Sequence, residues 1–121
     1  MSLFSRNKSE SKASKIYASK IKNDWDAGFK AGYPLWEKGE AERKAGNYEK
    51  AIAFYDRAKK SGYIAPALYK SYAMTYRKMK DTDSEIKILE EGIMRMQSSE
   101  GNFKTGIQNL KEQLAKAKTR L

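Results

Sequence analysis

The sequence predicts a single domain built only from α-helices. The chain has 121 residues, the length of one domain, and only two prolines, Pro34 and Pro66. Its apolar residues recur at three- and four-residue steps, the spacing that places side chains on one face of a helix. A pattern of two consecutive helices also repeats at an offset of 34 residues. A chain of this size buries enough surface for a modest core.

The composition argues against catalysis. There are no cysteines and no histidines, which excludes disulfides, thiolate metal sites and the commonest general base at neutral pH. No phosphate-binding Gly-x-x-x-x-Gly-Lys-Ser/Thr motif is present. The pairs Asp24/Asp26 and Asp81/Asp83 fall near predicted helix ends, where capping and the helix dipole explain them. We therefore expect no enzyme activity, no metal and no cofactor.

The charge points to acidic partners. The formal net charge is +10, which favours nucleic acid, an acidic protein surface or an anionic membrane. No window approaches the roughly 18 uninterrupted apolar residues that a membrane span requires. The first 15 residues lack the apolar run of a secretory signal. With no cysteines, the chain fits a reducing compartment, and we expect a cytoplasmic location.

Residues 1–11 are polar, basic and rich in serine, and we expect them to form a flexible tail before a domain over 12–121. A first helix is predicted to start near Ser11. Aromatic and aliphatic residues at i, i+4 spacing form a stripe on this helix, made of Tyr17, Ile21, Trp25 and Phe29. The stripe is predicted to face the core, with lysines on the solvent-exposed face. The segment 32–34, Gly-Tyr-Pro, is predicted to end this helix and start the next. The Gly28-x-x-x-Gly32 spacing, flanked by charges, indicates close packing or a break.

The next two helices are predicted to form a hairpin. Leu35 to Lys44 form the first, and Gly46 can adopt the left-handed conformation that closes it. Asn47 is a candidate cap for the second helix, which runs from Tyr48 to about residue 60. One apolar face of that helix carries Tyr48, Ala51, Ile52, Tyr55 and Ala58.

A second hairpin and a final helix follow. Gly62 is predicted to stop the preceding helix, and Pro66 to open one that runs to about residue 80. Thr82 and Glu85 form a predicted capping box for the following helix, which fades near residue 97. The last helix has a seam with alternating steps of four and three, made of Phe103, Ile107, Leu110, Leu114, Ala117 and Leu121. This helix is predicted to cap the open end of the array; the alternative is pairing with a second copy, giving a homo-oligomer.

The repeat at an offset of 34 has the period of tetratricopeptide arrays. Apolar positions coincide with apolar ones and small with small, as for Leu35 and Tyr69, Gly39 and Ala73, Ile52 and Ile86, Phe54 and Ile88, Tyr55 and Leu89, and Ala58 and Gly92. Over about 32–97 the chain resembles the tetratricopeptide repeat (TPR) family. The resemblance implies a TPR-like α-α superhelix with repeats at about 32–65 and 66–99, an N-terminal helix, and a C-terminal capping helix over about 102–121.

The second repeat departs further from the family pattern. Glu85 stands in place of the packing alanine, and Lys80 in place of the turn glycine. The proline that usually closes a repeat is missing after both copies. A rival resemblance is the three-helix microtubule-interacting and trafficking domain, which the 34-residue repeat disfavours.

The resemblance implies a concave groove, lined by the first helix of each pair, that takes a peptide or a partner's helix. The groove residues carried over from the first repeat are Trp36, Glu40, Arg43 and Lys44, and those from the second are Lys70, Met74, Arg77 and Lys78. The family's Lys and Asn carboxylate clamp is not evident, because Trp36 and Glu40 occupy its first two positions. The alternative for Trp36 is packing against the first helix, and for each charge an ordinary solvated side chain.

The sequence thus predicts a non-catalytic protein-interaction module, an adaptor or assembly subunit whose partner is an acidic protein or peptide. The alternative is a nucleic-acid-binding accessory protein that uses the basic residues near the two ends. Those residues are Lys12, Lys15, Lys20 and Lys22, and Lys111, Lys116, Lys118 and Arg120.

Overall fold

Five helices account for most of the chain in the computed structural model, which describes residues 24–99 and 101–121. They are a helix over residues 24–44, α2 (Tyr48–Lys60), α3 (Pro66–Lys78), α4 (Thr82–Ser98) and α5 (Lys104–Lys118). Among these residues no strand occurs, which confirms the all-α prediction. Some predictions concern residues outside the described ranges. These are the tail, the start of the first helix, Tyr17 and Ile21 of its stripe, and the four N-terminal lysines.

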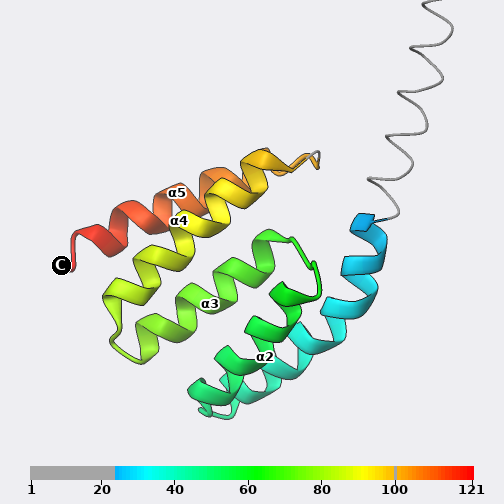
Figure 1. The fold of residues 1–121 in the computed structure, drawn as a ribbon. Helices are drawn as coiled ribbons and strands as arrows, with labels where there is room; N and C mark the ends of the chain where they lie inside the picture. Colours follow the sequence, from blue (N-terminus) through cyan, green and yellow to red (C-terminus); the bar gives the residue numbers. More distant parts are fainter. Residues whose placement is uncertain (1–23, 100) are drawn as a thin grey trace, which may run out of the picture.

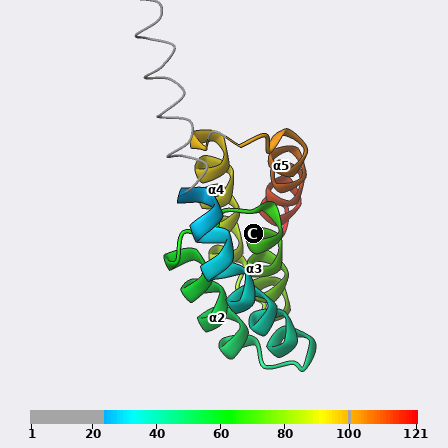
Figure 2. The ribbon, with the colours of Figure 1, turned by 90° about the vertical axis from the view of Figure 1, so that its right-hand side faces the viewer.

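The helices follow one another as antiparallel neighbours and form two layers (Figures 1 and 2). In Figure 2, α3 and α5 make one layer and α2 and α4 make the other, and the 24–44 helix crosses in front of α2 and α3. Helix α4 packs against both α3 and α5, while α3 also contacts α2 and α5. Helix α3 therefore lies between α2 on one side and the pair α4 and α5 on the other (Figure 1).

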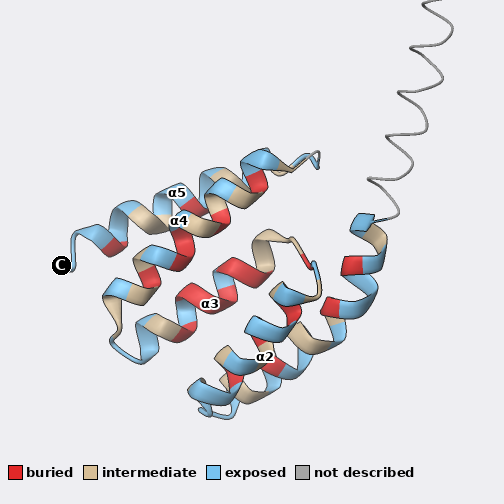
Figure 3. Cartoon of the chain, viewed as in Figure 1, coloured by how far each residue is buried: buried red, intermediate tan, exposed pale blue. Residues whose placement is uncertain are grey.

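The core is rich in tyrosine and centres on α3. Tyr55, Tyr69, Tyr72, Leu68 and Leu89 are fully buried. In Figure 3 the buried positions follow one side of each helix, as expected when amphipathic helices bury their apolar stripes. The rings of Tyr55 and Tyr72 lie 5.3 Å apart between centroids, a distance typical of favourable aromatic pairs.

The predicted break at Gly32-Tyr33-Pro34 is wrong, because the helix continues from residue 24 to residue 44. Gly28 and Gly32 are buried and let the backbone approach Gly62 and Tyr63, so the spacing serves close packing. The rings of Phe29 and Tyr33 stack 5.0 Å apart before the proline, and the Tyr33 and Trp36 rings, 5.4 Å apart, lie on either side of it. Tertiary contacts of Gly32 with Tyr63 and of Trp36 with Ser71, on either side of Pro34, thus offset the hydrogen bond that proline removes from the helix.

The prediction that the aromatic stripe of this helix faces the core is wrong for its two described members. Trp25 and Phe29, expected in the core, are 38% and 36% exposed. Their rings stack on each other at 5.5 Å, and Phe29 also meets Tyr63 edge-on at 5.7 Å. Phe29 therefore packs against the connector between α2 and α3, while part of both rings remains exposed to solvent.

The two hairpin turns share an unusual backbone conformation. Gly46 has a φ of 84° and Lys80, which lies 34 residues later, a φ of 61°. Gly46 was expected to be left-handed, and this is confirmed. Lys80 adopts the same region although it carries a side chain, which costs about 1–2 kcal/mol for an L-residue.

Two predicted caps are replaced by other contacts. Asn47 is the N-cap residue of α2, but its side chain makes no capping bond and instead donates to Glu42 at 2.9 Å. In α4 the cap is Asp81, whose carboxylate accepts from the Ser84 backbone N–H at 3.1 Å. Thr82 is therefore the first residue of the helix, and the Thr82/Glu85 capping box is not formed.

Helix α5 covers the open side of α4. Leu110 and Ala117 are buried, and Ile107 and Leu114 pack against the same core. The outer positions of α5 are mostly polar, so its apolar seam faces the body of the protein as far as Ala117. This is the arrangement expected of a cap. Leu121, the last residue of the predicted seam, lies beyond the end of α5 and is 78% exposed, so its prediction as part of the seam is wrong.

Candidate interaction surface

Positive charge is concentrated on α3 and α5, two helices that contact each other. Helix α3 carries three cations and no carboxylate, and α5 carries four lysines and one glutamate. Helix α4, in the other layer, carries four carboxylates and two cations. Since α3 and α5 are in contact, their cations reinforce one another on one side of the protein.

A hollow of about 200 Å³ lies between α3 and α5 on this basic side. We call it the α3/α5 hollow. It is lined by Ala73, Met74, Arg77, Glu85, Gln113, Lys116 and Arg120. Met74 is 41% exposed, so the hollow combines an accessible apolar side chain with three cations.

The three cations of the hollow differ in their pairing. Arg120 Nη1 donates to Glu85 Oε1 at 2.7 Å, and Glu85 is only 3% exposed. Arg77 and Lys116 are exposed and make no ion pair with any residue that the structure describes. Two cations thus remain available for a ligand without loss of an internal contact.

Glu40 and Arg43, predicted in the groove, serve an internal contact instead. Arg43 donates two hydrogen bonds to the Glu40 carboxylate, at 2.7 and 3.2 Å, and the Tyr55 hydroxyl donates a third at 2.6 Å. Burial of Glu40 opposes its ionisation, but the bonds from Arg43 and Tyr55 outweigh it and lower the pKa of Glu40 below 4.5. These side chains hold the first hairpin together, so neither is free for a partner.

Trp36 is also engaged within the protein. Its indole Nε1 donates to Ser71 Oγ on α3 at 3.0 Å, and its ring packs against Tyr33. It is half-buried, which places it at the edge of the α3 surface. The contact joins the 24–44 helix to α3.

The remaining predicted groove residues are exposed. Lys70, Met74 and Arg77 recur at steps of four and three on α3 and therefore share one face. Of the eight predicted residues, only Met74 and Arg77 line the α3/α5 hollow. Lys78 and Lys44 are exposed outside it.

The structure adds Gln113, Lys116 and Arg120 to this surface. In the sequence, Lys116 and Arg120 are part of the basic C-terminal end, with no indication that they lie beside α3. Lys116 lies in the last turn of α5 and Arg120 in the turn that follows, but only the packing of this end of the chain shows that they border Met74 and Arg77.

Helix α2 makes polar contacts with both α3 and α4. The Tyr72 hydroxyl donates to Asp56 at 2.7 Å, and Lys59 pairs with Glu91 at 3.0 Å. Lys59 Nζ also lies 5.4 Å from the centroid of the Tyr72 ring. These contacts connect α2 with α3 and α4.

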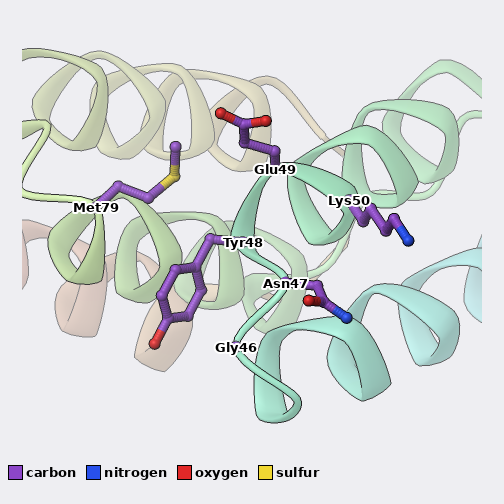
Figure 4. Close-up of a pocket in the computed structure, with 6 residues that line it drawn as sticks. All are labelled: Gly46, Asn47, Tyr48, Glu49, Lys50 and Met79. Atoms are coloured by element: carbon purple, nitrogen blue, oxygen red, sulfur yellow. The ribbon is translucent and has the colours of Figure 1, made fainter.

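A second hollow, of about 510 Å³, lies at the turn between the 24–44 helix and α2 (Figure 4). It is lined by Gly46, Asn47, Tyr48, Glu49, Lys50 and Met79. In Figure 4, Tyr48 lies beside Met79, whereas the side chains of Asn47 and Lys50 point away from it. The charges there, Glu49 and Lys50, are of opposite sign, so this hollow has no preference for a charged partner.

Within the described ranges, no helix is both long and apolar enough to cross a bilayer. Those residues also contain no group of three or more acidic side chains placed to hold a metal ion. No protein-family model matches the chain, and no curated protein or solved structure matches it significantly.

Proposed function

We propose that this protein is a non-catalytic interaction module, an adaptor or assembly subunit, that binds an acidic peptide or helix along α3 and α5. The observation that carries the proposal is the set of exposed cations around Met74 in the α3/α5 hollow. Arginine and lysine bind carboxylates, and an exposed methionine adapts to varied apolar side chains. The binding surface is narrower than the sequence suggested, because Trp36, Glu40 and Arg43 serve internal contacts.

We further propose that the two hairpins are TPR-like repeats. Equivalent positions 34 residues apart have similar environments: Gly46 and Lys80 have positive φ, and Tyr55 and Leu89 are fully buried. The alternation of helices between two layers also suits a repeat array in which each hairpin stacks on the next (Figure 2). In such an array, one layer offers a surface to ligands.

The proposal is tested by affinity capture from native cell extract, with and without nuclease. The informative variant reverses two exposed charges of α3, Lys70→Glu with Arg77→Glu. Its matched control reverses two exposed charges of α2, Lys50→Glu with Lys60→Glu. Circular dichroism confirms that both variants retain the helical fold.

We expect protein partners that survive nuclease and moderate salt, that the α2 control retains and that the α3 variant loses. Equal capture by both variants would exclude α3 as the binding surface. Partners that disappear with nuclease, and whose binding weakens roughly ten- to a thousandfold as salt rises, would identify the protein as a nucleic-acid-binding accessory protein instead.

A further inference from the structure

We propose that the α3/α5 hollow is a receptor for a phosphoryl group, carried on a serine or threonine of the partner segment. This inference rests on the proposed function and specifies its ligand. The net charge of the hollow is the first argument. Its side chains carry three positive charges, from Arg77, Lys116 and Arg120, and one negative charge, from Glu85. The net charge of the hollow is therefore two positive charges.

A phosphomonoester matches this charge better than a carboxylate does. It carries about −1.5 to −2 at pH 7, whereas a glutamate or aspartate carries one negative charge. A carboxylate in the hollow would leave one cation uncompensated. A phosphoryl group would be balanced by Arg77 and Lys116 while Arg120 keeps its bond to Glu85.

The donors that line the hollow also suit a phosphoryl group. Arginine offers a planar fork of N–H donors that matches phosphate oxygens, lysine adds a point charge, and Gln113 can add an amide N–H. Met74 and Ala73 supply an apolar wall for the carbon atoms that bear the phosphate. Met74, Arg77, Gln113 and Lys116 come from two helices that pack on each other, so the donors are held by rigid elements.

A nucleic-acid backbone fits the hollow less well. Each phosphodiester carries a single negative charge, and affinity for a polynucleotide arises from a series of phosphate contacts along a track. The hollow instead concentrates its cations around one volume of about 200 Å³. The observations therefore favour a single, doubly charged group.

The experiment is a titration followed by NMR of ¹³C-labelled methionine methyl groups in the full-length protein. Met74 lines the hollow, whereas Met79 and Met94 are exposed elsewhere and serve as internal controls. The probes are N-acetyl-phosphoserine methylamide, its unphosphorylated serine counterpart and N-acetyl-glutamate methylamide. A single-stranded oligonucleotide is the fourth probe.

We expect phosphoserine to shift the Met74 methyl signal saturably and to leave Met79 and Met94 unchanged. The glutamate probe should bind roughly five- to tenfold more weakly, since it has half the charge and fewer acceptors. Arg77→Gln and Lys116→Gln should each weaken phosphoserine binding by a similar factor. Their matched controls, Lys78→Gln and Lys118→Gln, change exposed neighbours outside the hollow and should leave it unchanged.

Equal affinity for glutamate and phosphoserine would overturn the phosphoryl site and leave the acidic-peptide surface standing. The phosphoryl site would also be overturned if neither the phosphoserine probe nor the glutamate probe shifted the Met74 signal. The proposed function would then be judged by the capture experiment alone. Tighter binding of the oligonucleotide, lost in the same two variants, would assign the hollow to nucleic acid.

Discussion

Arg120, which follows α5, donates a hydrogen bond to the carboxylate of Glu85 in the first turn of α4, with 2.7 Å between Nη1 and Oε1. Glu85 is buried and stands 34 residues after Ala51, which is buried at the equivalent place in the first hairpin. The carboxylate is thus accommodated where an alanine would suffice, because α5 brings a counter-charge to it. The contact joins the end of the chain to the second hairpin and forms one wall of the α3/α5 hollow.

Removal of Arg120 should therefore destabilise the protein. Arg120→Gln leaves a buried carboxylate without its cation, which should lower the free energy of unfolding by about 1–3 kcal/mol. Adding Glu85→Ala should recover most of this loss, because the alanine requires no partner. Urea unfolding of the wild type, both single variants and the double variant completes the cycle. Lys118→Gln is the control, and a loss below about 0.3 kcal/mol for Arg120→Gln would show that the pair contributes little.

The turn at Lys80 should be improved by glycine. Lys80→Gly removes the side chain that strains a φ of 61°, and we expect the free energy of unfolding to rise by about 1 kcal/mol. The converse change, Gly46→Ala, should lower it by about 1 kcal/mol, because an added Cβ meets nothing within 4 Å and only the backbone conformation opposes it. Thermal or urea unfolding measures both. Stabilisation by Gly46→Ala would contradict the left-handed turn.

Glu40 should make stability depend on pH in the acid range. Its pKa is lowered in the folded protein, so the unfolded chain binds its proton first as pH falls. The stabilisation is therefore fully present above about 4.5 and is lost as pH falls through the lower folded value. The difference in unfolding free energy between wild type and Glu40→Gln should shrink over that interval. Glu37→Gln, at an exposed position of the same helix, is the control, and a difference that stays constant with pH would contradict the prediction.

The buried tyrosines should make the protein sensitive to base. Burial raises the pKa of Tyr55 to about 12, with a further contribution from its bond to Glu40, and burial raises the pKa of Tyr69 to about 12 as well. Each keeps its proton longer in the folded state, so stability is full below about 10 and falls as pH rises from there to about 12. Tyrosinate absorbance and circular dichroism should therefore change together. Full ionisation of tyrosine in a chain that remains helical would contradict the burial of these rings.

Much of the local structure could be predicted from the sequence. The spacing of apolar residues predicted helices with nearly the bounds of α2 (Tyr48–Lys60), α4 (Thr82–Ser98) and α5 (Lys104–Lys118). This is possible because amphipathic periodicity depends only on residues close together in the sequence. Gly46 was predicted to be left-handed because glycine alone adopts that region without a steric cost. The exact caps were harder, since the Asn47 side chain binds the Glu42 carboxylate instead of the backbone, and Asp81 rather than Thr82 caps α4.

The candidate surface could be predicted only in part. Met74 and Arg77 were carried over from the family resemblance, and both line the α3/α5 hollow. Glu40 and Arg43 have the same appearance in the sequence but bond to each other, and Glu40 also accepts a hydrogen bond from Tyr55, 15 positions later. Local spacing carries no information about which charged side chains find a partner across the fold.

The sequence by itself determined an all-helical chain, the position of its hairpins and its excess of positive charge, because these depend on residue types and short-range periodicity. Tertiary structure alone decided that the helix continues through Pro34, that α5 brings Lys116 and Arg120 beside Arg77, and that Glu85 is buried with a counter-ion. Each of these depends on contacts between segments far apart in the chain. The packing of helices onto one another supplies the energy that overrides a local break signal and selects which charges remain free.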